Sequence, residues 1–142
     1  MPDSAKLPTN YEKIFKHSDL ARIRRDQTCA TIIANNPNFF SFHKGEAALE
    51  TIRFASAFFG KGQFKGQKLE HKNGKYILRQ QLAGPYYQPF PKEKLPNDGD
   101  WEKMNRFLRP QSEIQKYEAV VAVSESEGTF LLDINILFLL SN

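Results

Sequence analysis

The chain has 142 residues, which suits one domain with a sizeable core, because a globule of this size buries roughly two-thirds of the surface that its unfolded chain exposes. Twelve Phe, five Tyr and one Trp, with 25% charged residues, are typical of packed structure and argue against disorder. A net charge of +4 favours anionic partners but falls well short of a histone-like composition. The single cysteine, Cys29, excludes an intrachain disulfide and a cysteine-based metal cluster.

The first ten residues are polar, contain two prolines and are interpreted as a tail, so the expected domain spans residues 11–142. They lack the basic segment and long apolar run of an export signal, and the compartment is not predicted. No apolar run reaches the roughly 20 residues of a spanning helix. The strongly apolar segment Phe130 to Leu140 is followed by two residues only. We therefore expect either a piece of a longer chain or a last strand that is central in its sheet.

Short β-branched runs dominate the first third of the chain. Leu20–Arg25 and Thr28–Ala34 predict a hairpin, and the turn cluster at residues 35–38 separates it from a short strand at Phe39–Phe42. Residues 46–59 fit both a helical stripe and a strand face, and the Phe-Phe pair before a glycine-rich loop favours the strand. The glycines of that loop predict a bulge or a tight corner between sheets, because no P-loop ending follows them.

The segment Phe64–Leu82 predicts a hairpin around Asn73-Gly74, since Asn-Gly favours the type I′ turn. A two-residue loop fixes the register. One face is expected to pair Leu69 with Leu78, His71 with Tyr76 and Lys65 with Leu82. The other face is expected to pair Glu70 with Ile77, Lys68 with Arg79 and Lys72 with Lys75. This ribbon should have one apolar and one basic face.

The remaining chain predicts a proline-rich surface loop at residues 84–96, a short helix at 98–109 that carries Trp101, and a hairpin of Tyr117–Val123 with Thr129–Leu140. Strands at spacings of about ten residues, with turn signals between them, are typical of an antiparallel sandwich or barrel. The expected fold is all-β: an antiparallel β-sandwich built from hairpins, with one short helix.

The basic face of the hairpin is the best functional indication, because a bound polyanion would relieve repulsion among its charges. The predicted anion-binding strip consists of Lys61, Lys65, Lys68, Lys72, Lys75 and Arg79. Aromatic residues of the proline-rich loop could stack on sugar rings beside it, namely Tyr86, Tyr87 and Phe90. The alternatives are that the lysines guard a sheet edge against pairing and that the aromatics pack on the domain itself.

Other chemistry has weaker support in the sequence. The three histidines are scattered, so neither a metal site nor a cofactor is predicted. A small enzyme that uses His71, Tyr76 and Arg79 for proton abstraction would require these side chains to converge in one pocket. No recognition-helix or RNP-like pattern supports nucleic acid as a partner.

The run RIRRDQTCATIIANNPNFFSFHKG, followed by IRFASAFFGKGQF, resembles the β-rich C-terminal domain of heparinase II/III-like polysaccharide lyases over about the first half of the chain. The resemblance implies an exported β-sandwich of a longer protein whose helical domain supplies most of the lyase chemistry. No catalytic residue of that family matches a position here. The implied function is a non-catalytic module of a carbohydrate-processing protein that binds acidic polysaccharide.

The alternative function is a structural or assembly domain. Its apolar C-terminal strand would pair with another chain, as a homo-oligomer, or with the remainder of a longer chain. A charge at Phe138 or Leu140 should then abolish the association.

Overall fold

The structure is a computed structural model that describes residues 7–87, 92–95, 99–100, 102 and 111–140. Its strands in these residues are β1 (Asn10–Phe15), β2 (Leu20–Arg25), β3 (Thr28–Ile33), β4 (Phe40–Lys44), β5 (Ala47–Ile52), β6 (Leu69–Lys72), β7 (Lys75–Tyr87), β8 (Gln111–Ser126) and β9 (Thr129–Leu140). A 3-10 turn, η1, covers Lys92–Lys94.

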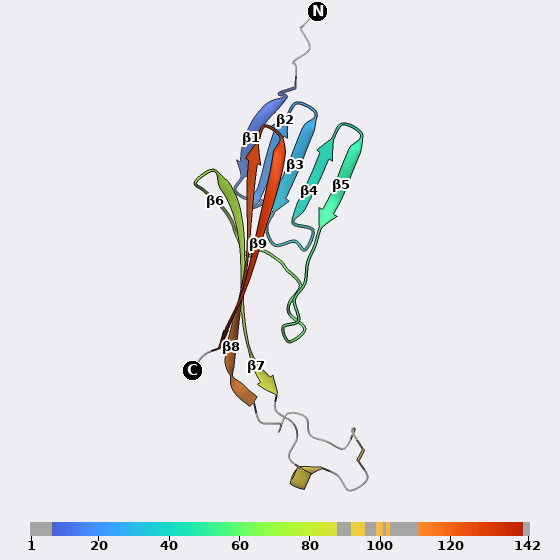
Figure 1. Cartoon of the computed structure of the whole chain (residues 1–142), viewed down its shortest axis with the longest axis vertical. Helices are drawn as coiled ribbons and strands as arrows, with labels where there is room; N and C mark the ends of the chain where they lie inside the picture. Colours follow the sequence, from blue (N-terminus) through green and yellow to red (C-terminus); the bar gives the residue numbers. More distant parts are fainter. Residues whose placement is uncertain (1–6, 88–91, 96–98, 101, 103–110, 141–142) are drawn as a thin grey trace, which may run out of the picture.

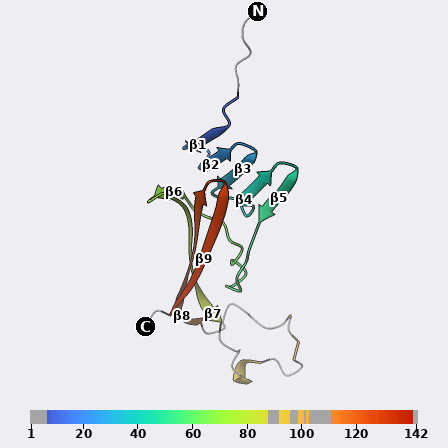
Figure 2. The same ribbon diagram turned by 45° about the horizontal axis from the view of Figure 1, so that its top comes forward.

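The strands form two antiparallel sheets in simple up-and-down order. The first sheet has the order β1-β2-β3-β4-β5, and the second has the order β6-β7-β8-β9. Figure 1 shows the short strands of the first sheet lying across the upper half of the long second sheet, with the lower parts of β7, β8 and β9 continuing beyond it. The rotated view in Figure 2 keeps the two sheets as separate layers. The predicted all-β antiparallel sandwich is confirmed.

Alternating apolar positions place the core between the sheets. In β3 every second residue is buried, beginning with Thr28, and in β8 the buried positions are Tyr117, Ala119, Val121 and Val123. The apolar side chains among them join one cluster with residues of β2, β4 and β7. A strand with a period of two can bury only one face, so the intervening residues point to solvent.

The predicted hairpins of β2 with β3 and of β8 with β9 are confirmed. The predicted hairpin register is also confirmed from the pair Leu69–Leu78 to the pair Lys72–Lys75. Asn73 and Gly74 have φ values of 53° and 73°, as a type I′ turn requires. A strand is confirmed in the first half of the ambiguous segment, as β5.

The hairpin prediction was wrong in the strand before the turn, because β6 begins at Leu69 rather than at Phe64. Residues 53–68, here called the connector, lead from β5 to β6 and lie against both sheets. Asn35 N–H donates to Gly66 O at 2.6 Å, and Gln67 N–H donates to Arg79 O at 2.9 Å. The first bond draws the connector toward the first sheet, so the predicted pairs of Lys65 and Lys68 are not part of the ladder.

The loop predicted from Gly84 was wrong over its first four residues, because β7 continues to Tyr87. Gly84 pairs with Gln115 and Pro85 with Ile114 of β8, which starts six residues earlier than predicted. The proline is tolerated because β6 pairs only with the first residues of β7, and no other described strand pairs with Pro85 on that side. The predicted helix at 98–109 lies outside the described residues except at 99, 100 and 102, where Asp100 Oδ1 accepts the Glu102 N–H at 3.0 Å.

Strand β1 was not predicted. It lies at an edge of the first sheet, and its burial pattern has no buried position. A strand without a buried face leaves no period-two signal in the sequence.

Candidate functional site

The basic hairpin carries its charges on the face away from the core. Its core face holds Leu69, Tyr76 and Leu78, so the intervening residues point outward. Two of the six predicted cations lie in ion pairs: Lys72 Nζ is 3.3 Å from Glu70, and Arg79 Nη1 is 2.9 Å from Glu118. These carboxylates reduce the positive charge at the centre of the strip.

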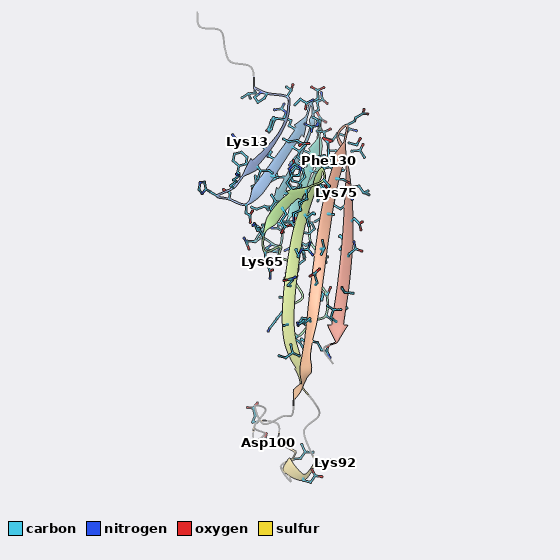
Figure 3. All side chains as sticks on the ribbon, turned by 90° about the vertical axis from the view of Figure 1, so that its left-hand side faces the viewer. Lys13, Lys65, Lys75, Lys92, Asp100 and Phe130 are labelled. Atoms are coloured by element: carbon cyan, nitrogen blue, oxygen red, sulfur yellow. The ribbon has the colours of Figure 1, made fainter. Side chains whose placement is uncertain are left out.

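The other four predicted cations, Lys61, Lys65, Lys68 and Lys75, have exposed side chains. Lys61, Lys65 and Lys68 belong to the connector, whereas Lys75 lies at the turn between β6 and β7. In Figure 3, Lys75 lies above Lys65. Of the predicted stacking residues, Tyr86 and Tyr87 fall in β7 rather than in a loop, and Phe90 lies outside the described residues.

The structure brings together only part of the predicted acid/base group. The rings of His71 and Tyr76 are parallel, with centroids 4.2 Å apart, and His71 is exposed while Tyr76 is buried. Arg79 points to the opposite face, toward Glu118. The three side chains therefore do not converge in one pocket.

A polar cluster around Tyr76 joins the two sheets instead. Tyr76 Oη donates to Glu12 at 3.3 Å, and Arg25 Nη2 lies 2.7 Å from the same carboxylate. Arg25 Nε also lies 2.5 Å from Glu125, which is nearly buried near the β8–β9 turn. Burial, followed by the charge of Glu12, raises the pKa of Tyr76 to about 12. Sequence reasoning missed this cluster, since its members are distant in the chain and share no spacing.

Tyr76 should make the protein sensitive to alkali. An unfolded tyrosine loses its proton near pH 10, whereas folded Tyr76 keeps it until its pKa of about 12. Between these two pH values the unfolded chain binds fewer protons than the folded chain. The contribution of Tyr76 to the free energy of unfolding is therefore complete below pH 10 and falls by up to about 1.4 kcal/mol per pH unit above it. Urea unfolding measured at several pH values across this range should show that the free energy of unfolding falls less steeply with pH for Tyr76→Phe than for the wild type. Parallel declines would contradict the assignment.

The second feature of functional interest is the outer edge of the second sheet. Among the strands that the structure describes, β9 pairs with β8 alone and lies at the end of the sheet order. Six large apolar side chains of β9 are exposed among those whose placement the structure describes, and they are here called the apolar edge: Leu131, Ile134, Ile136, Leu137, Phe138 and Leu139. Their exposed fractions range from 41% for Ile134 to 66% for Leu131. The alternative prediction, that the last strand of the chain is central in its sheet, was therefore wrong.

The apolar edge has members on both faces of β9. Phe130 packs against Phe40 and Phe42 of the first sheet, with ring centroids 5.9 Å and 5.6 Å apart. Even-numbered residues of β9 therefore point inward and odd-numbered ones outward. Edge strands usually carry lysine, proline or inward-pointing charge to prevent pairing, but Asp133 is the only charged residue of β9.

An open groove lies beside this edge, between the two sheets. Its volume is about 370 Å³, and its apolar lining comes from Phe40, Phe42, Leu49, Ile52, Phe130 and Leu132. Leu49 and Ile52 belong to β5, the edge strand of the first sheet, and pair with Phe42 and Phe40. Phe40 and Phe42 of β4 contact Phe130 of β9, and the adjacent strand β5 supplies the opposite wall of the groove. Sequence reasoning gave no sign of it, since its two walls are about 80 residues apart.

Comparison of the chain with known protein families, with curated proteins and with solved structures finds no match. The described residues contain no helix that is long and apolar enough to cross a bilayer. Within the same residues, no group of three or more His, Cys, Asp and Glu side chains is arranged to hold a metal ion.

Proposed function

We propose that the protein is an assembly domain whose edge strand β9 pairs with a β-strand of another chain. The observation that carries the proposal is the apolar edge, whose six large side chains are exposed on a strand with a single charged residue. A long, exposed, apolar edge is a template for strand addition, in which main-chain hydrogen bonds supply affinity and side chains supply specificity.

Strand addition through β9 should be lost when a charge enters the edge. Ile136→Lys is the better variant, because Ile136 is 42% exposed whereas Phe138 also packs on Tyr117 of its own core. Replacing the apolar contact of Ile136 with a charged side chain should weaken self-association at least about tenfold. Sedimentation equilibrium over a range of concentrations measures the effect.

The matched control is Ile14→Lys, on edge strand β1 of the other sheet. Ile14 is 37% exposed, so the control introduces the same charge at a similar exposure. It should leave the association unchanged. Equal loss in both variants would assign the effect to net charge, and an oligomer that survives Ile136→Lys would refute pairing through β9.

A second candidate function, binding of acidic polysaccharide, is favoured by the exposed side chains of Lys65, Lys68 and Lys75. Neutralising these three with glutamine should shift elution from heparin to lower salt, because each removed cation weakens a screened electrostatic contact. The control removes three exposed lysines elsewhere, Lys13, Lys16 and Lys92. Equal shifts in the two triple variants would reduce the binding to net charge.

A further inference from the structure

The sequence of β9 is nearly the same in both directions around Ile134. The residues F-L-L-D-I-N-I-L-F, 130 to 138, place similar side chains at equal distances on the two sides of this centre. The matched positions are Phe130 with Phe138, Leu131 with Leu137, Leu132 with Ile136, and Asp133 with Asn135. A strand of this kind is complementary to an antiparallel copy of itself.

We propose that the partner of β9 is β9 of a second copy of this chain, paired antiparallel about a two-fold axis at Ile134. This inference rests on the proposed function and specifies its partner. Residues directly opposite in an antiparallel pair share a face, so like pairs with like on both faces. The two four-stranded sheets would join into one sheet of eight strands with a self-complementary interface.

The polar residues of β9 favour this register over its neighbours. Centring at Ile134 places Asp133 opposite the partner's Asn135, an acceptor opposite a donor. Within one chain these side chains already form such a bond, Asn135 Nδ2 to Asp133 Oδ1 at 3.1 Å. Centring at 133 would oppose two carboxylates, and centring at 135 would place Asp133 opposite the partner's Leu137. Like charges directly opposite are destabilising.

The same register fills the open groove. Ile136 and Phe138 are exposed because the lower part of β9 continues beyond the first sheet of its own chain (Figure 1). Pairing would bring the partner's Phe138 beside Phe130, on the inner face, in the space opposite β5. Leu49 and Ile52 line that space. In a symmetric dimer, the exposed Phe138 of each chain would thus cover the open groove of the other chain.

Cysteine cross-linking tests the register in the full chain with Cys29→Ser. Ile134→Cys should form a disulfide dimer under mild oxidation. Leu131→Cys alone and Leu137→Cys alone should not, because positions six residues apart along paired strands are about 20 Å apart, beyond disulfide reach. An equal mixture of the last two variants should give about tenfold more cross-linked dimer than either alone, since their cysteines lie opposite each other.

The outcomes separate this inference from the proposed function. An oligomer that Ile136→Lys disperses, but that cross-links through Leu131→Cys alone, would keep pairing through β9 and overturn the antiparallel register. If the wild-type protein is a monomer and none of the three cysteine variants forms a cross-linked dimer, a second copy of this chain is not the partner of β9. An oligomer that is insensitive to Ile136→Lys would overturn both proposals.

Discussion

Replacing Gly62 with alanine is expected to destabilise the protein by several kcal/mol or to prevent folding, because the added methyl group would collide with main chain. A Cβ at this position would lie 1.6 Å from Ser56 O and 2.6 Å from Ser56 C. The same two residues are joined by a hydrogen bond from Ser56 N–H to Gly62 O, at 2.8 Å. Neither side of the contact is a flexible side chain, so relief of the clash would break the bond that closes the connector.

Gly60→Ala is the matched control in the same connector. A Cβ at Gly60 would meet nothing within 4 Å, and its φ of +71° costs an alanine only about 1–2 kcal/mol. Urea unfolding monitored by circular dichroism compares the two variants. If Gly62→Ala lowers the free energy of unfolding no more than Gly60→Ala does, the connector can relax to accommodate the added methyl group. Soluble expression decides the comparison if Gly62→Ala does not fold, because Gly60→Ala should remain soluble.

The hairpin of β6 and β7 was predictable from the sequence, whereas the path of the connector that contains Gly62 was not. A two-residue Asn-Gly turn determines which residues pair, so the register from Leu69 to Leu78 followed from local chemistry. The path of the connector depends instead on contacts between residues that the sequence does not relate, such as Asn35 N–H with Gly66 O. The glycine-rich loop indicated a corner between sheets, but not which main-chain atoms approach it.

The candidate site was predictable only in composition. The apolar character of Phe130 to Leu140 was evident, but whether the strand lies in the middle or at the edge of its sheet depends on the sheet order. Likewise, the lysines of the hairpin were identified, whereas the ion pair of Arg79 with Glu118 depends on the pairing of β7 with β8. Burial and partnership are properties of the tertiary structure, and a single sequence records them only through periodicity.

Phe64→Ala is expected to cost about 3–5 kcal/mol of unfolding free energy, the range for large-to-small changes at fully buried aromatic positions. Phe64 has no exposed surface. Its ring stacks on Phe54 with centroids 4.6 Å apart and meets the edge of Phe39 at 5.0 Å. Removing the ring would leave a cavity between the connector and the first sheet, and both ring contacts would be lost with the burial.

The control for Phe64→Ala is Phe15→Ala, which removes the same atoms from edge strand β1, where the ring is 40% exposed. Its loss should be clearly smaller, since the surroundings of an exposed ring are refilled by water. Phe64→Leu should fall between the two and keeps the comparison measurable if the alanine variant unfolds. Equal losses in Phe64→Ala and Phe15→Ala would mean that the connector contributes little to stability. The sheets would then be held together chiefly by the cluster around Tyr76 and by the facing residues of β3 and β8.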